Sequence, residues 1–172
     1  MRSMAEVPSG KGVEVFVLVR TVIYAALGIG LLVVLLPPET LSAWGVARPA
    51  SIGPLQIIGI AVGVLGTALA AWSVLTFAFI GRGTPVPFDP PRRLVETGPY
   101  RFVRNPMAMG VGLLLAGIAL FYESATFGGL TVLFYLFIHL MVILYEEPTL
   151  RRMFGEEYEA YLRRVRRWVP RL

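Results

Sequence analysis

Four long stretches of the chain contain no Asp, Glu, Lys or Arg: 21–38, 49–81, 105–122 and 124–145. A helix that crosses a bilayer needs roughly 20 consecutive apolar residues, and each stretch approaches or exceeds that length. The composition agrees, because 56% of the 172 residues are hydrophobic and the mean hydropathy is +0.68. We therefore expect one all-α, polytopic membrane domain over residues 1–172, with about four transmembrane helices. The expected spans cover about residues 14–37, 53–80, 106–122 and 125–146.

Basic residues are concentrated in three of the segments that flank these stretches. The segment before the first stretch, the loop between the second and third, and the carboxyl-terminal tail are rich in arginine, whereas the first loop has only Arg48. Lys and Arg in short loops favour the cytoplasmic side. We expect an integral, multi-pass protein with both termini in the cytoplasm. Orientation and attraction to anionic headgroups explain the net charge of +5, so we expect no nucleic-acid partner.

The residue types that build most metal and redox sites are scarce. The chain has no cysteine and a single histidine, His139. Disulfides, iron–sulfur ligation, thiolate nucleophiles and zinc sites of His and Cys are therefore excluded, and we expect no metal. A lone histidine in an apolar stretch is a candidate functional residue that can face the same cavity as the glutamates that follow it. A hydrogen bond to a neighbouring helix is the alternative.

Small residues recur on successive turns of the second stretch, at Gly59, Gly63, Gly66 and Ala70. This spacing favours the close approach of another helix, so we expect these residues to serve packing. The segment 81–99, which follows, contains five prolines and several arginines. Proline disfavours regular helix there, and a loop of this length is more often functional or disordered than a simple connection. We expect a proline-rich loop at the cytoplasmic surface.

Asn105 and Pro106 predict the start of a helix, because Asn can accept from free backbone amides and proline suits the first helical position. The third and fourth stretches then form a hairpin, closed by Glu123 and Ser124. With this topology, Arg104 and Asn105 emerge at the same cytoplasmic mouth as the pair Glu146 and Glu147, although about 40 residues separate them.

The tail after Pro148 carries apolar residues at three- and four-residue spacings and charged residues between them. This pattern predicts a carboxyl-terminal amphipathic helix that lies on the membrane or over the loop. A membrane anchor and a lid over a site are both open as its role. The apolar stripe consists of Leu150, Phe154, Tyr158, Tyr161, Leu162, Val165 and Trp168.

Charged groups gather at the predicted mouth, where Arg101 and Arg104 face Glu146 and Glu147. Ionisable groups at the edge of a bilayer are costly unless paired, hydrated or used. A structural salt bridge is one explanation. A zwitterionic ligand with a positive centre is the other, because a helix start favours anions and carboxylates at a helix end favour cations. S-adenosylmethionine carries both kinds of charge, and we take it as the hypothetical cofactor.

The motifs of the carboxyl-terminal half follow a recognisable order. Gly98-Pro99-Tyr100 leads into Arg104-Asn105-Pro106 and Gly110, and after the hairpin come Glu146-Glu147, Leu150, Phe154-Gly155, Tyr158, Tyr161 and Pro170. In these residues the segment 83–170 resembles the isoprenylcysteine carboxyl methyltransferase and phospholipid methyltransferase family of integral membrane methyltransferases. The resemblance implies S-adenosylmethionine as cofactor and a lipid-associated acceptor.

The resemblance also implies site residues. It implies catalytic roles for Arg104, Asn105, Glu146 and Glu147. It implies cofactor contacts for the following set: Pro85, Arg92, Arg93, Leu94, Val95, Tyr100, Asn105, Pro106, Met107, Ala108 and Glu146.

Three positions depart from the family pattern. Asn105 stands where the eukaryotic enzymes have histidine, and Ala108 stands where tyrosine is usual. Asparagine still donates and accepts hydrogen bonds, whereas alanine does not. Val142 takes the place of an arginine thought to hold a prenylcysteine carboxylate. We therefore do not expect carboxyl methylation of prenylated proteins.

The sequence thus predicts an S-adenosylmethionine-dependent methyltransferase whose acceptor is a membrane lipid or a lipid-associated hydrophobic molecule. Such a site positions the reactants, because transfer from a sulfonium needs no protein nucleophile. A noncatalytic membrane scaffold, in which the arginines and glutamates only brace the hairpin, is the first alternative. A membrane reductase is a weaker one, because the chain has no dinucleotide glycine fingerprint.

Overall fold

The structure is a computed structural model that describes residues 23–30, 38–43, 45–80 and 94–170. In these ranges the chain is mainly helical and contains no strand, and residues 23–30 are helical. The later elements are the helices α2 (Pro38–Ala43) and α3 (Pro54–Ile80), the 3-10 helix η1 (Gly98–Arg101), the helices α4 (Pro106–Phe121) and α5 (Ala125–Met141), the π-helix η2 (Val142–Glu146), and the helix α6 (Glu147–Arg164).

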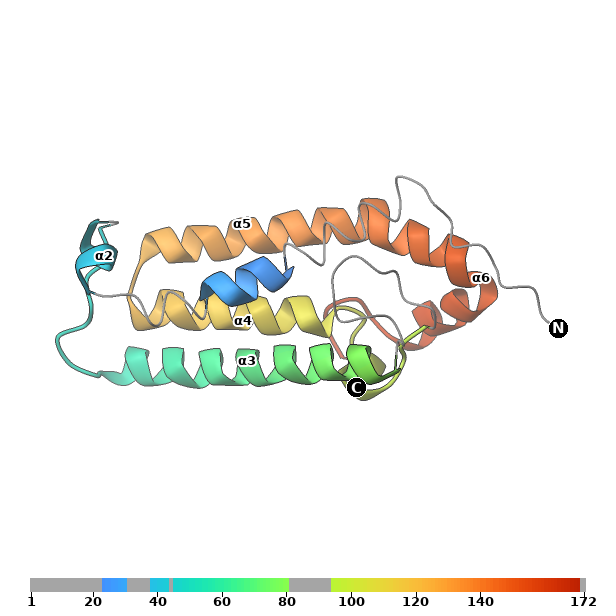
Figure 1. Ribbon diagram of the computed structural model, residues 1–172, viewed down its shortest axis with the longest axis horizontal. Coiled ribbons are helices and arrows are strands. Elements are labelled where there is room, and N and C mark those ends of the chain that lie inside the picture. The colour runs from blue at the N-terminus through green and yellow to red at the C-terminus, as the bar shows by residue number, and fades with distance from the viewer. Residues whose placement is uncertain (1–22, 31–37, 44, 81–93, 171–172) are drawn as a thin grey trace.

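Helices α3, α4 and α5 lie side by side, each antiparallel to the next (Figure 1). Residues 54–77 and the continuous helix from Ala125 are long and apolar enough to cross a membrane, while α4 is a shorter apolar helix. The prediction of an all-α fold is therefore confirmed for the described residues, which include two candidate membrane spans. Four crossings stay a prediction, since only residues 23–30 of the expected first span are described.

Glycines bring α3 and α4 into backbone contact. A Cβ atom on Gly66 would lie 2.5 Å from the backbone nitrogen of Leu114, and one on Gly110 would lie 2.5 Å from that of Ala70. Two turns away, Gly117 meets Gly63 in the same manner. These positions therefore admit only glycine, and the packing role predicted from the spacing of small residues agrees with the contacts.

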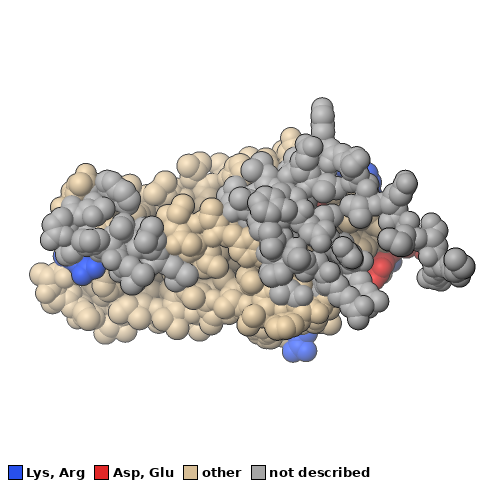
Figure 2. All heavy atoms as spheres, viewed as in Figure 1, with Lys and Arg blue, Asp and Glu red and all other residues tan. Residues whose placement is uncertain are grey.

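The outer surface of the bundle is apolar. Large hydrophobic side chains on α3 and α5 are exposed, among them Phe79 at 80%. In Figure 2 the body of the visible face is free of charge, while charged atoms are seen at the left end and over the right-hand half. Such a surface faces hydrocarbon at low cost but would be costly in water.

The α4–α5 hairpin turns at the end of the bundle where α3 begins. Ser124 caps α5, because its Oγ accepts from the backbone N–H of Phe127. Glu123 takes a left-handed conformation with φ 48°, and its carboxylate accepts a 2.7 Å hydrogen bond from Gln56 Nε2 on α3. This contact fixes the turn against α3.

Helix α5 runs without a break through η2 into α6, which lies at the end of the bundle where α4 begins (Figure 1). Pro148 does not interrupt the helix, because it lies in the first turn of α6. The chain reverses at Gly155 (φ 51°, ψ −124°), and α6 ends at Arg164. The predicted stripe therefore continues too far, since Val165 and Trp168 lie in the extended segment that follows the helix.

Candidate active site

The residues that lead into α4 are held from two sides. In η1, Gly98 has φ +59° and packs against Thr76 of α3, where a Cβ would meet Thr76 Oγ1 at 2.7 Å. On the other side, the backbone N–H of Arg104 donates to the carbonyl of Arg166 over 3.0 Å, next to an isolated bridge between Val103 and Arg166. The segment after α6 therefore fixes the backbone of Arg104.

A cavity of about 50 Å³ lies between η1, the start of α4, η2 and α6. Its walls come from η1, η2 and α6, from the residues that precede η1 and α4, and from the end of α3, so residues about 40 apart in sequence face one another. The lining consists of Phe77, Leu94, Val95, Tyr100, Arg104, Asn105, Val142, Glu146, Glu147, Leu150, Tyr158 and Tyr161.

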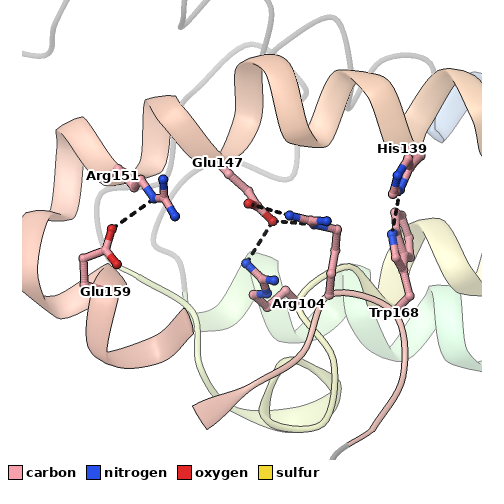
Figure 3. Close-up of polar contacts among 7 residues, drawn as sticks. Arg104, His139, Glu147, Arg151, Glu159 and Trp168 are labelled. Atoms are coloured by element: carbon pink, nitrogen blue, oxygen red, sulfur yellow. Dashed lines mark hydrogen bonds and ion pairs between the residues drawn. The ribbon is translucent and has the colours of Figure 1, made fainter. Parts of the chain in front are cut away.

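Glu147 is the centre of a buried ion cluster. Its side chain is 9% exposed and accepts from two guanidinium groups, as Figure 3 shows. Arg104 Nη1 donates to Oε1 over 2.9 Å, while Arg167 Nε and Nη2 donate to Oε1 and Oε2 over 2.7 and 2.9 Å. The hydrogen bonds to Glu147 raise the pKa of Arg167. The cluster of two cations and one carboxylate carries one net positive charge, and the carboxylate of Glu146 lies at the same cavity.

Two hydrogen-bond donors at the cavity are buried without a partner. They are Arg104 Nε and Asn105 Nδ2, which join no hydrogen bond in the structure as far as it is described. Asn105 occupies the N-cap position of α4, as predicted, but its side chain makes no capping hydrogen bond. The expected capping interaction is therefore wrong, and the amide is left for another acceptor. A buried donor without a partner costs free energy unless a ligand or water meets it.

Aromatic side chains also line the cavity. Tyr161 Oη donates to the carbonyl of Tyr100 over 2.7 Å, and the rings of Tyr100 and Phe77 lie 6.4 Å apart. Burial, and after it the nearby carboxylates of Glu147 and Glu146, raise the pKa of Tyr158. Burial likewise raises the pKa of Tyr161. Both phenols therefore stay neutral and supply ring faces rather than a base.

The π-helix aims both glutamates at the cavity. Residues five apart in an α-helix lie about 140° apart around the axis, so Val142 and Glu147 would point in different directions. In η2 the backbone N–H of Glu147 donates to the carbonyl of Val142, which is the wider i+5 turn. Val142, Glu146 and Glu147 consequently line the same cavity. No residue pattern in this stretch indicates such a turn.

His139 does not face this cavity. Its Nδ1 accepts a 3.0 Å hydrogen bond from Trp168 Nε1, and both side chains line a separate apolar groove with Met109 and Tyr135 (Figure 3). The expectation that His139 shares a cavity with Glu146 is therefore wrong. The alternative, a hydrogen bond to a neighbouring helix, is closer to the observed contact. The partner, however, comes from the carboxyl-terminal segment and not from a helix.

The other predicted site residues divide into three groups. Leu94, Val95 and Tyr100 line the cavity together with the four predicted catalytic residues. Pro106, Met107 and Ala108 are buried at the start of α4, outside its lining. Pro85, Arg92 and Arg93 lie outside the described residues. Sequence reasoning missed Phe77 and Arg167, because neither belongs to a motif and both reach the site through long-range packing.

The donor set fits one end of a zwitterionic ligand and Glu146 fits the other. Arg104 and Asn105 offer unsatisfied donors to an anionic group, and the carboxylate of Glu146 and the rings of Tyr100 and Tyr158 suit a cationic centre. S-adenosylmethionine has both groups. The cavity as it stands has room for only a few water molecules, so its walls must move apart to admit such a ligand. Among the described residues, no cluster of three His, Cys, Asp or Glu could hold a metal ion.

The apolar helices, their exposed hydrophobic surface and the charged cavity at one end define a helical membrane protein with a polar site at its edge. The profile of the family described as phospholipid methyltransferase matches residues 55–157, more than half of the chain. The chain therefore belongs to the phospholipid methyltransferase family and is a membrane methyltransferase in general terms. Searches of the curated proteins and of the solved structures gave no significant match.

Proposed function

We propose that this protein is an S-adenosylmethionine-dependent methyltransferase that methylates a membrane lipid or a lipid-associated hydrophobic molecule. One observation carries the proposal: a single cavity joins the unsatisfied donors of Arg104 and Asn105 to the carboxylate of Glu146 across the α4–α5 hairpin. The family match supports the reaction class. We further propose that this end of the bundle and both termini lie in the cytoplasm, in keeping with the arginine-rich segments.

When bound, S-adenosylmethionine supplies an electrophilic methyl group on a cationic sulfur, which becomes a neutral thioether as the methyl leaves. Arg104 and Asn105 bind the carboxylate of the methionine part through the two donors that have no other partner. Glu146 and the ring of Tyr158 stabilise the positive end. The protein needs no nucleophile of its own, so its contribution is to orient the reactants and exclude water.

Glu147 acts as a brace in this proposal and not as a general base. Both of its carboxylate oxygens already accept hydrogen bonds from Arg104 and Arg167, so its role is to position these arginines. Glu146 is the other carboxylate that lines the cavity, and we propose it as the base for an ammonium acceptor. An acceptor that is already anionic requires no base.

The acceptor approaches from the bilayer. The cavity side of η2 is apolar at Val142, and Phe77, Leu94 and Leu150 add hydrocarbon around it. These side chains suit an acceptor with an apolar body and give no cation for a carboxylate at position 142. The proposal therefore excludes a prenylcysteine carboxylate held at that position.

Titration calorimetry of the detergent-purified protein with S-adenosylmethionine tests the cofactor assignment. We expect submillimolar binding that weakens by about tenfold or more in Glu146→Gln, because the neutral amide loses the charge that faces the cationic end. Glu159→Gln is the matched control, since Glu159 pairs with the half-exposed Arg151 away from the cavity. No binding by well-folded wild-type protein would contradict the proposal and favour the scaffold.

Incubation with methyl-labelled cofactor and a total lipid extract identifies the acceptor class. We expect the label in the organic phase, in one chromatographic species that Glu146→Gln protein forms more slowly. Label that appears only in the aqueous phase would contradict a lipid acceptor.

A further inference from the structure

Glu147 is shared unequally by its two arginines. Arg167 takes both carboxylate oxygens through Nε and Nη2, whereas Arg104 makes a single bond through Nη1. The Nε of Arg104 is buried and has no partner in the described part of the chain. Arg104 lines the cavity and Arg167 does not. The residue with the stronger hold on Glu147 is therefore the one outside the cavity.

We propose that Arg167 is a positioning residue that keeps Arg104 available to the cofactor by occupying Glu147. This inference rests on the proposed function, because it assigns Arg104 a ligand to bind. Arg167 touches neither ligand nor reacting atoms and acts through Glu147 alone.

Competition for one carboxylate is the physical reason. A guanidinium and a carboxylate favour a bidentate pair with two parallel hydrogen bonds. With Arg167 absent, Glu147 becomes free to pair in this manner with Arg104, whose guanidinium then turns so that Nε and Nη2 donate to the two carboxylate oxygens. The donor that the cavity offers to an anionic group is then withdrawn. Arg167 also offsets the charge of Glu147, which otherwise repels that group.

The segment after α6 carries Arg167 into place by contacts on both sides of it. The carbonyl of Arg166 accepts from the backbone of Arg104 over 3.0 Å. Trp168 Nε1 donates to His139 Nδ1 over 3.0 Å and so fastens the segment to α5 (Figure 3). This contact also gives the lone histidine a role, as the anchor of the segment. Arg167 is thus fixed between two long-range contacts.

The test is calorimetry with S-adenosylmethionine on wild type, Arg167→Met, Glu147→Gln and the double variant. We expect Arg167→Met to weaken binding about tenfold, a coupling typical of residues in one ion cluster. We expect the double variant to recover most of that loss, because removing the charge of Glu147 removes the competitor for Arg104. A merely structural Arg167 predicts instead that the double variant binds no better than Arg167→Met.

Two further variants keep the result interpretable. Arg151→Met removes an α6 arginine that pairs with Glu159 on the exposed surface, and it should bind as wild type does. Arg167→Lys retains the positive charge beside Glu147 but not the bidentate geometry, so we expect an intermediate loss. Unfolding midpoints measured without ligand establish that each variant is folded.

The possible results distinguish the positioning role of Arg167 from the cofactor assignment on which it rests. Failure of folded wild type and Arg151→Met to bind would overturn both the cofactor assignment and the role of Arg167. If wild type binds normally and both Arg167→Met and Arg167→Lys bind as tightly as wild type, the positioning role alone is overturned. Loss without recovery in the double variant would also overturn it.

Discussion

Asn105 has the position of a helix cap but not its interaction. The backbone at Asn105 precedes α4 and Pro106 takes the first helical position, yet the amide nitrogen is buried without a partner among the described residues. Placing asparagine at a helix start is ordinary, so the sequence alone predicts a cap. The absence of a capping hydrogen bond in the structure is what indicates that the Asn105 side chain serves the site.

Replacing Asn105 by leucine tests whether its amide serves a ligand or the helix. The leucine side chain has the same branching but no donor, so it fills the space and removes the buried, unsatisfied group. We expect an unchanged or slightly higher unfolding midpoint and a clear loss of S-adenosylmethionine affinity. A loss of about 1 kcal/mol in stability with unchanged affinity would identify a capping role instead.

At the scale of elements, the charge-free stretches anticipated three helices within a few residues. Helices α3 and α4 begin at Pro54 and Pro106, and α5 begins after the cap Ser124. Apolar runs, prolines and caps are local signals, so they can be read without the fold. The antiparallel contact of α3 with α4 is not local, but its glycine spacing indicated it.

A methyl group at Gly66 tests that contact. The Cβ of Gly66→Ala would lie 2.5 Å from Leu114 N and 2.6 Å from Gly110 O, both of which are backbone atoms. The helices must move apart, so we expect a loss of about 1–3 kcal/mol, measured by thermal unfolding in detergent. Gly128→Ala on α5 is the control, because nothing lies within 4 Å of its Cβ and alanine favours helix. Equal midpoints for the two variants would contradict close α3–α4 packing.

The π-turn and the reversal at Gly155 could not be predicted from the sequence. An α-turn and a π-turn have the same composition, and only the packing of Val142 and Glu147 toward one cavity distinguishes them. Gly155 permits φ 51°, but a glycine inside a helical pattern can also lie in an uninterrupted helix, so its presence does not predict a reversal. The roles of Arg167 and Trp168 depend on that reversal, which explains why the sequence predicted a longer helix with Trp168 on its apolar stripe and Arg167 on its charged surface.

At the scale of the whole molecule, the two ends of the bundle differ. The α4–α5 turn lies at one end and α6 at the other (Figure 1). Arg48 shares a pocket with Phe121 and Tyr122 beside the turn, while η1 and the ion cluster adjoin α6. The arginine distribution predicted this division, because charge in short loops follows membrane orientation. In the proposed orientation, a ligand from the cytosol reaches only the end with the cavity.

The absence of cysteine in the natural chain makes this division directly measurable. Ala47 and Glu157 are exposed residues at opposite ends. We expect a membrane-impermeant maleimide to label Ala47→Cys in intact cells and Glu157→Cys only after the membrane is permeabilised. Cysteine-free wild type gives the background. Labelling of both positions from the same side would contradict the proposed topology.

The central claim is that one ligand bridges two segments separated by a buried hairpin. Hydrogen–deuterium exchange with and without S-adenosylmethionine measures this directly. The account predicts that the ligand slows exchange in two separate peptides, around residues 94–104 and around residues 147–162, and leaves α2 unchanged. Slower exchange in only one of the two peptides, or in neither, would contradict it.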